Sequence, residues 1–144
     1  MEKNPTMLFV VAAALIRPDG KICLQKRPKN KAMAGLWEFP GGKVEADEAP
    51  AAALVRELDE ELGIGVESSS LTPLTFASQP LADRNLLLLL YTCHHWDGEV
   101  SALESPELGW FLPSEMKLLQ MPPADGPFID ALTCYLERPS AEHP

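Results

Sequence analysis

One segment, residues 50–62, constrains the fold of this chain more than any other. Pro50 suits the first turn of a helix, and Gly63 suits the position just past its end. On a helical wheel at about 100° per residue, the apolar side chains of this segment fall between about +60° and +160° from Glu57. A helix with such a stripe must bury it against another element, so we expect the rest of the chain to supply a sheet.

Runs of β-prone residues on both sides of the helix predict that sheet. The expected strands are 8–16, 21–27, 36–39, 71–78, 86–96 and 107–112, with a helical turn at 116–119 and a second helix at 128–137. The turn residues 18–20 (PDG) predict a hairpin of the first two strands, and residues 40–42 (PGG) are expected to end the third. The unbroken leucines 86–90 are typical of a strand buried on both faces. This order predicts an α/β (α+β) fold, a mixed sheet held between helices.

Length and charge narrow the class of protein. The 144 residues fit a single domain, 1–144. The net charge of −9 argues against a nucleic-acid partner, although bound divalent cations would let an acidic chain hold a polyphosphate. The apolar run 7–16 is too short to cross a bilayer, so we interpret it as a core strand and expect no membrane association. Cys23, Cys93 and Cys134 are expected to be buried free thiols of a cytoplasmic protein.

Three glutamates of the predicted helix carry the chemistry. Glu60 and Glu61 fall at about −60° and +40° from Glu57, so the three carboxylates share one arc beside the apolar stripe. Like charges at this spacing repel one another, and a merely solvated acidic face would lie opposite the stripe. Their position therefore favours a cation bound among them. Mg²⁺ prefers such hard oxygen ligands and retains several waters.

The segment 42–64 resembles the signature of the Nudix hydrolases, G-x5-E-x7-R-E-U-x-E-E-x-G-U, where U is apolar. Every specified position is matched, by Gly42, Glu48, Arg56, Glu57, Leu58, Glu60, Glu61, Gly63 and Ile64. From average residue usage, a chance match is on the order of one in a billion per starting position. Residues 37–43 (WEFPGGK) and 122–125 (PPAD) are also similar to the MutT-like branch, which sanitises the nucleotide pool. The resemblance implies the Nudix fold, a mixed β-sheet in an α/β/α sandwich.

The resemblance implies a metal site on the helix. Glu57 and Glu61, with the backbone carbonyl of Gly41, would bind Mg²⁺, for which Mn²⁺ can substitute. Glu60 would be a further ligand or the base that takes a proton from water. Arg56 is expected to clamp the acidic side chains rather than bind phosphate.

Two loop glutamates are also expected near this site. Glu48 would make a structural contact from its loop to the helix. Glu104 aligns with a loop glutamate that MutT-like enzymes bring to the metal, although an exposed loop residue is an equal alternative. Glu99 and Glu107 are nearby competitors for that role.

Substrate-binding residues follow from the same resemblance. Arg27 would reach the phosphate or sugar of a nucleotide, or else mark the polar end of a strand. The segment Glu38, Phe39, Pro40 and Gly41 would line the base and sugar pocket, with Phe39 equally suited to the core. Asp125 stands where a MutT-type enzyme has an asparagine that reads oxidised guanine, so a preference for 8-oxo-guanine over guanine is left open. A helix N-terminal role for Asp125 is the alternative.

These expectations describe an enzyme that hydrolyses 8-oxo-dGTP, or a related (deoxy)nucleoside triphosphate, to the monophosphate and pyrophosphate. One alternative is a pyrophosphohydrolase of CTP or of another nucleoside diphosphate derivative. Another is a non-catalytic nucleotide-recognition module of the Nudix type. The expected partner is a small-molecule nucleotide, and the protein would be a monomer or a homodimer.

Overall fold

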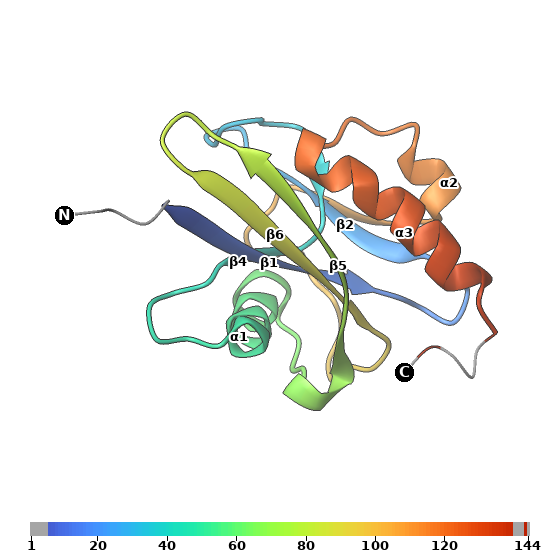
Figure 1. The fold of residues 1–144 in the computed structure, drawn as a ribbon. Helices are drawn as coiled ribbons and strands as arrows, with labels where there is room; N and C mark the ends of the chain where they lie inside the picture. Colours follow the sequence, from blue (N-terminus) through green and yellow to red (C-terminus); the bar gives the residue numbers. More distant parts are fainter. Residues whose placement is uncertain (1–5, 140–142, 144) are drawn as a thin grey trace.

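The computed structural model describes residues 6–139 and 143 (Figure 1). In chain order the elements are β1 (Met7–Leu15), β2 (Ile22–Lys26), β3 (Trp37–Glu38), β4 (Gly41–Lys43), α1 (Pro50–Leu62), η1 (Ser68–Ser70), β5 (Leu71–Pro80), β6 (Asn85–Cys93), β7 (Leu108–Phe111), α2 (Pro113–Met116), η2 (Pro123–Asp125) and α3 (Gly126–Glu137). The strands form a four-stranded sheet in the order β4-β1-β6-β5 and a three-stranded sheet in the order β3-β2-β7. The first sheet is mixed, as predicted, because β1 runs parallel to β6 while β4 and β5 run antiparallel to their neighbours.

Helices cover both faces of the mixed sheet, with α1 on one side and α3 on the other (Figure 1). Val11 of β1 is buried in one core cluster together with Leu58 of α1. Ala14, on the opposite face of the same strand, is buried in a second cluster with Phe128 and Leu132 of α3. Burial on both sides of the sheet explains why β1 is almost uniformly apolar. The arrangement confirms the predicted α/β/α sandwich.

The leucine run confirms the expected burial on both faces of β6. Leu88 and Leu90 lie in the cluster that faces α3. Leu89 packs against the cluster that faces α1. The strand ends at Cys93, three residues before the predicted end.

The predicted hairpin of the first two strands is wrong. The turn forms, since Gly20 N–H donates to Arg17 O at 2.8 Å, but one isolated bridge, Ile16 to Ile22, is the extent of the pairing. Beyond it β1 and β2 enter different sheets. The reason is competition for hydrogen-bonding edges, because β4 and β6 occupy both edges of β1.

A strand is also present where the chain was expected to break. Gly41–Lys43 forms β4 and pairs with β1, with Gly41 opposite Ala12. Gly41 has a φ of 156°, and a Cβ built on it would lie 1.9 Å from the carbonyl oxygen of Val11. The glycines therefore permit an unusually close approach of two strands, where the sequence pattern indicated a strand end.

The helices agree closely with the prediction. Helix α1 spans Pro50–Leu62 as expected, and Gly63 ends it in the left-handed conformation at φ 71°. Helix α3 begins two residues earlier than predicted, and the short helix α2 ends at Met116, the first residue of the predicted turn at 116–119. None of the helices in the described part of the chain has both the length and the apolar composition needed to cross a membrane.

The cysteine prediction is correct for two residues of three. Cys23 and Cys93 are buried free thiols. Cys134 is also free but exposed, because it lies on the outer side of α3.

Candidate functional site

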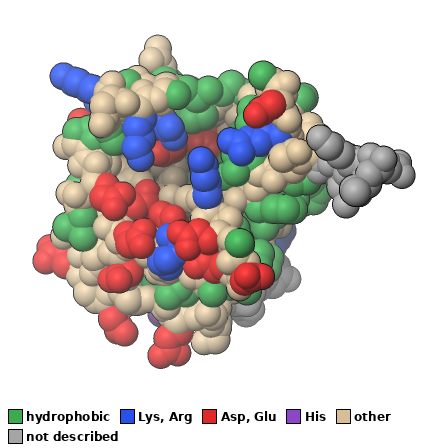
Figure 2. Space-filling model, turned by 90° about the vertical axis from the view of Figure 1, so that its left-hand side faces the viewer, with side chains coloured by type: hydrophobic (Ala, Val, Ile, Leu, Met, Phe, Trp, Pro, Cys, Tyr) green, Lys and Arg blue, Asp and Glu red, His purple; other side chains and the backbone are tan. Residues whose placement is uncertain are grey.

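A cavity of about 720 Å³ brings together residues that are far apart in the sequence. Its volume falls within the usual range for small-molecule sites. Among its lining residues are Arg27, Glu38, Phe39, Gly41, Glu57, Glu61, Glu104 and Asp125. Acidic side chains gather on one side of the hollow and Lys and Arg side chains on the other (Figure 2). Pro40 is buried beneath this surface, where its carbonyl accepts a hydrogen bond from Ala13 N–H at 2.9 Å.

Glu61 lies at the inner end of the acidic side. The residue is 9% exposed, and its two carboxylate oxygens accept hydrogen bonds from Gln25 Nε2 at 2.8 Å and from Gly41 N–H at 3.0 Å. The pKa of Glu61 is raised to about 8, mainly by burial and also by the charge of Glu57, although the hydrogen bond from Gln25 opposes the shift. A positive partner would therefore favour the ionised carboxylate at neutral pH.

Glu57 lies one helical turn earlier, against the backbone of β4. Its side chain is 16% exposed and accepts a hydrogen bond from Arg56 Nη1 at 2.9 Å. Burial raises the pKa of Glu57, and Arg56 opposes that effect. A Cβ built on Gly42 would lie 2.4 Å from the carboxyl carbon of Glu57. Glycine at this position is thus what allows the carboxylate to reach the strand.

Arg56 forms the predicted clamp. Its guanidinium donates to Glu48 at 2.9 and 3.0 Å, to Glu57 at 2.9 Å and to the carbonyl of Lys43 at 3.2 Å. The contact with Glu48 confirms the expected link from the loop to the helix. Hydrogen bonds from Arg56 hold the pKa of Glu48 at about 2. The network fixes the direction of the Glu57 carboxylate.

Two further glutamates, Glu60 and Glu104, differ in whether they line the cavity. Glu60 is half exposed, with its side chain 50% accessible, and accepts from Arg56 at 3.4 Å. It is absent from the described residues that line the cavity. Glu104 does line the cavity, because Leu103 N–H donates to the carbonyl of Glu61 at 3.0 Å and holds this loop against the end of α1.

The two competitors of Glu104 lie elsewhere. Glu107 forms an ion pair with Lys26 at 3.3 Å. Glu99, like Glu107, is absent from the described residues that line the cavity. The structure therefore brings Glu104 to the acidic side, and its charge contributes to the raised pKa of Glu57.

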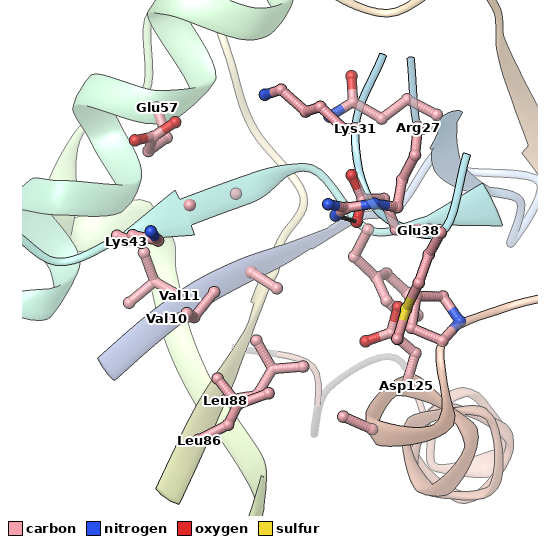
Figure 3. Close-up of a pocket in the computed structure, with 18 of the residues that line it drawn as sticks. Val10, Val11, Arg27, Lys31, Glu38, Lys43, Glu57, Leu86, Leu88 and Asp125 are labelled. Carbon is pink, nitrogen blue, oxygen red and sulfur yellow. Dashed lines mark hydrogen bonds and ion pairs between the residues drawn. The ribbon is translucent and has the colours of Figure 1, made fainter. Parts of the chain in front are cut away.

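Asp125 lies across the cavity from Glu57 (Figure 3). The residue is 5% exposed, and its carboxylate makes no hydrogen bond within the described part of the chain. Asp125 stands at the N-cap position of α3 but makes no capping hydrogen bond, so the alternative of a helix N-terminal role stays open beside the base-reading role. The pKa of Asp125 is raised to about 7, mainly by burial and also by the charge of Glu38.

Arg27 and Glu38 form an ion pair beside Asp125. Arg27 Nη1 donates to Glu38 Oε2 at 2.7 Å, and its Nε donates to the carbonyl of Ala32 at 2.7 Å. Arg27 thereby also holds the basic loop 28–35 over the cavity. Phe39 lines the cavity while its ring packs edge-to-face on Phe128, with ring centroids 6.0 Å apart, so it lies both on the cavity wall and in the core.

Sequence reasoning missed several polar residues of the cavity, among them Lys31, Lys43 and Gln25. Lys43 lies beside Glu57, and Lys31 extends from the basic loop (Figure 3). Gln25 is almost fully buried on β2 and contacts Glu61. The available signal for Gln25 was a polar residue directly after the apolar run 22–24. No pattern in the sequence showed that it faces Glu61.

The acidic side has the donor types that a hard divalent cation requires. Within the described residues, no three His, Cys, Asp or Glu side chains already stand close enough to hold a metal. However, two largely buried carboxylates, Glu57 and Glu61, lie beside the glycine backbone of β4, where any Cβ at position 42 would displace Glu57. Mg²⁺ commonly uses one or two carboxylates and completes its shell with water and substrate oxygens. The residues present therefore fit such an ion.

Comparisons with known proteins agree with this geometry. The family model described as NUDIX domain matches residues 7–132. A CTP pyrophosphohydrolase of Escherichia coli is 41% identical over 86% of this chain and 90% of that protein. An 8-oxo-dGTP diphosphatase of Haemophilus influenzae is 36% identical over 87% of this chain and 91% of that protein. The solution structure of the E. coli ORF135 protein superposes with a TM-score of 0.83 at 38% identity, covering 94% of this chain and 96% of the other.

Proposed function

The chain belongs to the Nudix family and is a pyrophosphohydrolase of the MutT-like type, and we propose that it cleaves 8-oxo-dGTP or a related (deoxy)nucleoside triphosphate to the monophosphate and pyrophosphate. One observation carries the proposal. The cavity is lined by the largely buried Glu57 and the buried Glu61, and the buried Asp125 lies across it from Glu57. This arrangement of carboxylates suits a ligand with a polyphosphate at one end and a base at the other.

We propose Mg²⁺ as the cofactor, held by Glu57, Glu61 and the carbonyl of Gly41, with Mn²⁺ as a substitute. When bound, such an ion neutralises phosphate charge and lowers the pKa of water. Arg56 keeps the Glu57 carboxylate oriented for this task through its 2.9 Å hydrogen bond. Glu60 would contribute from the outer edge of the site, since half of its side chain is accessible.

Glu104 is the proposed general base. It lies on the cavity wall near Glu57, whereas Glu60 points toward Arg56 at the rim. In the reaction, the oxygen of water attacks a phosphorus atom, its proton passes to the Glu104 carboxylate, and the bond to the leaving phosphate oxygen breaks. Lys31 and Lys43 also line the cavity and would supply positive charge for the phosphate oxygens.

Asp125 is the proposed reader of the base. An ionised carboxylate accepts from two neighbouring N–H donors, which guanine and 8-oxo-guanine present at N1 and the exocyclic amine. A protonated carboxyl donates one hydrogen bond and accepts another. That pattern suits cytosine, which presents an acceptor at N3 and a donor at its amine.

CTP is therefore the second candidate substrate. Two observations favour it: the 41% identity to a CTP pyrophosphohydrolase and the raised pKa of Asp125, about 7. With a guanine-type substrate, kcat/KM is expected to rise as pH increases through about 7. With CTP it is expected to fall over the same range, provided that Asp125 reads the base.

The decisive experiment is a turnover screen of the wild-type enzyme with Mg²⁺, measuring pyrophosphate release from 8-oxo-dGTP, dGTP, CTP and dCTP. Glu57→Gln and Glu61→Gln are each expected to reduce turnover by about 10²-fold or more while the protein stays folded. Asp59→Asn, an exposed change on the same helix, is the matched control. Wild-type turnover in both Gln variants would refute the metal assignment. Pyrophosphate release that is equally fast without any divalent ion would refute the cofactor.

The location proposed for the enzyme is the cytoplasm, because its reducing conditions suit the two buried free thiols, Cys23 and Cys93.

A further inference from the structure

Gln25 is a buried polar residue that neither the family signature nor the reaction requires. It lies on β2 and is 3% exposed. Strand β2 is otherwise apolar over residues 22–24, which are all fully buried. A glutamine placed there costs free energy unless both ends of its amide are satisfied.

The two ends of the amide have different surroundings. Nε2 donates to Glu61 Oε1 at 2.8 Å. Oε1 is buried and has no hydrogen-bond partner within the described part of the chain. The reversed orientation of the amide would turn Oε1 toward the carboxylate, placing two acceptors together. The contact with Glu61 therefore fixes which end is left without a partner.

We infer that Gln25 is a positioning residue for the divalent cation: its Nε2 holds the Glu61 carboxylate in place, and its Oε1 offers a neutral oxygen to the hydrated ion. Gln25 also belongs to the wall of the cavity that holds Glu57 and Glu61. An unsatisfied acceptor at such a place requires an explanation, and a bound ion with its waters supplies one.

This role differs from a purely structural one in a measurable way. If the amide served only packing, an apolar side chain of the same length would leave metal affinity unchanged. If it serves the ion, the same change weakens metal binding without lowering the stability of the metal-free protein, because the unsatisfied acceptor disappears as well.

The inference rests on the proposed metal dependence, and Mn²⁺ binding to the metal-free enzyme tests the two separately. Gln25→Met is expected to raise the Mn²⁺ dissociation constant about 10-fold or more, measured by electron paramagnetic resonance of free Mn²⁺. Thermal unfolding without metal should show no loss of stability. Gln79→Met is the matched control, since Gln79 lines another part of the cavity and makes no hydrogen bond to Glu61 in the described structure.

Gln25→Asn provides a second variant should the methionine prevent folding. It keeps the amide but withdraws it by one methylene group, so it is also expected to bind Mn²⁺ more weakly. A dissociation constant within two-fold of wild type in the folded variants would overturn the role of Gln25. Failure of the wild-type enzyme itself to bind Mn²⁺ would instead overturn the proposed cofactor.

Discussion

Replacing Asp125 with asparagine should make the stability of this protein less dependent on pH. Burial raises the pKa of Asp125 from 3.8 to about 7. Asparagine has nearly the shape of the protonated carboxyl and cannot ionise. The folded wild-type protein, by contrast, must either keep Asp125 protonated or hold a buried charge near Glu38.

The size of the effect follows from linkage. Because the pKa of Asp125 is raised in the folded state, its protonated carboxyl contributes its full stability below about pH 4. That contribution is lost as pH rises through about 7. Each pKa unit corresponds to about 1.4 kcal/mol, so the rise corresponds to roughly 4 kcal/mol at pH 8. Asp125→Asn is therefore expected to match wild type near pH 4 and to exceed it by up to about 4 kcal/mol at pH 8.

The assay is urea unfolding of both proteins at several pH values between 4 and 8.5, compared as the difference in free energy of unfolding. Other titrating groups are shared by the two proteins and largely cancel in this difference. A difference that stays constant from pH 4 to pH 8.5 would refute the buried, uncompensated state of Asp125. A variant that is less stable than wild type at pH 8 would refute this state of Asp125 more strongly.

Three further outcomes follow from the geometry. Gly42→Ala should displace the Glu57 carboxylate, because the new Cβ would lie 2.4 Å from its carboxyl carbon. The variant should therefore bind Mn²⁺ about 10-fold or more weakly, and unchanged Mn²⁺ binding would contradict this argument. Arg56→Lys should lower kcat about 10-fold or more, since lysine cannot reproduce the two hydrogen bonds that Arg56 donates to Glu48. A wild-type kcat would show that catalysis does not need Arg56 to hold the acidic side chains. Glu104→Gln should lower kcat about 10²-fold with little change in Mn²⁺ binding; a larger loss in Glu60→Gln would transfer the role of base to Glu60.

Local signals in the sequence were sufficient to predict the helix and the face that carries its glutamates. Pro50 and Gly63 determine where α1 begins and ends, and the 3.6-residue period places Glu57 and Glu61 next to the apolar stripe. These properties depend on neighbours along the chain, so they are readable without a tertiary structure. The same holds for the apolar runs that became β1 and β6.

Tertiary structure decided what depends on competition and on contacts between distant segments. The turn residues 18–20 predicted a hairpin of β1 and β2, but β4 and β6 pair with the two edges of β1 instead. The helical wheel placed Glu61 nearer the apolar stripe than Glu60, but it could not show that β2 and β4 supply the hydrogen-bond donors that contact the Glu61 carboxylate. The contact of Gln25 with Glu61 joins residues 36 positions apart, and no local pattern encodes it. The sequence thus determined which groups are available, while packing determined which of them meet in the cavity.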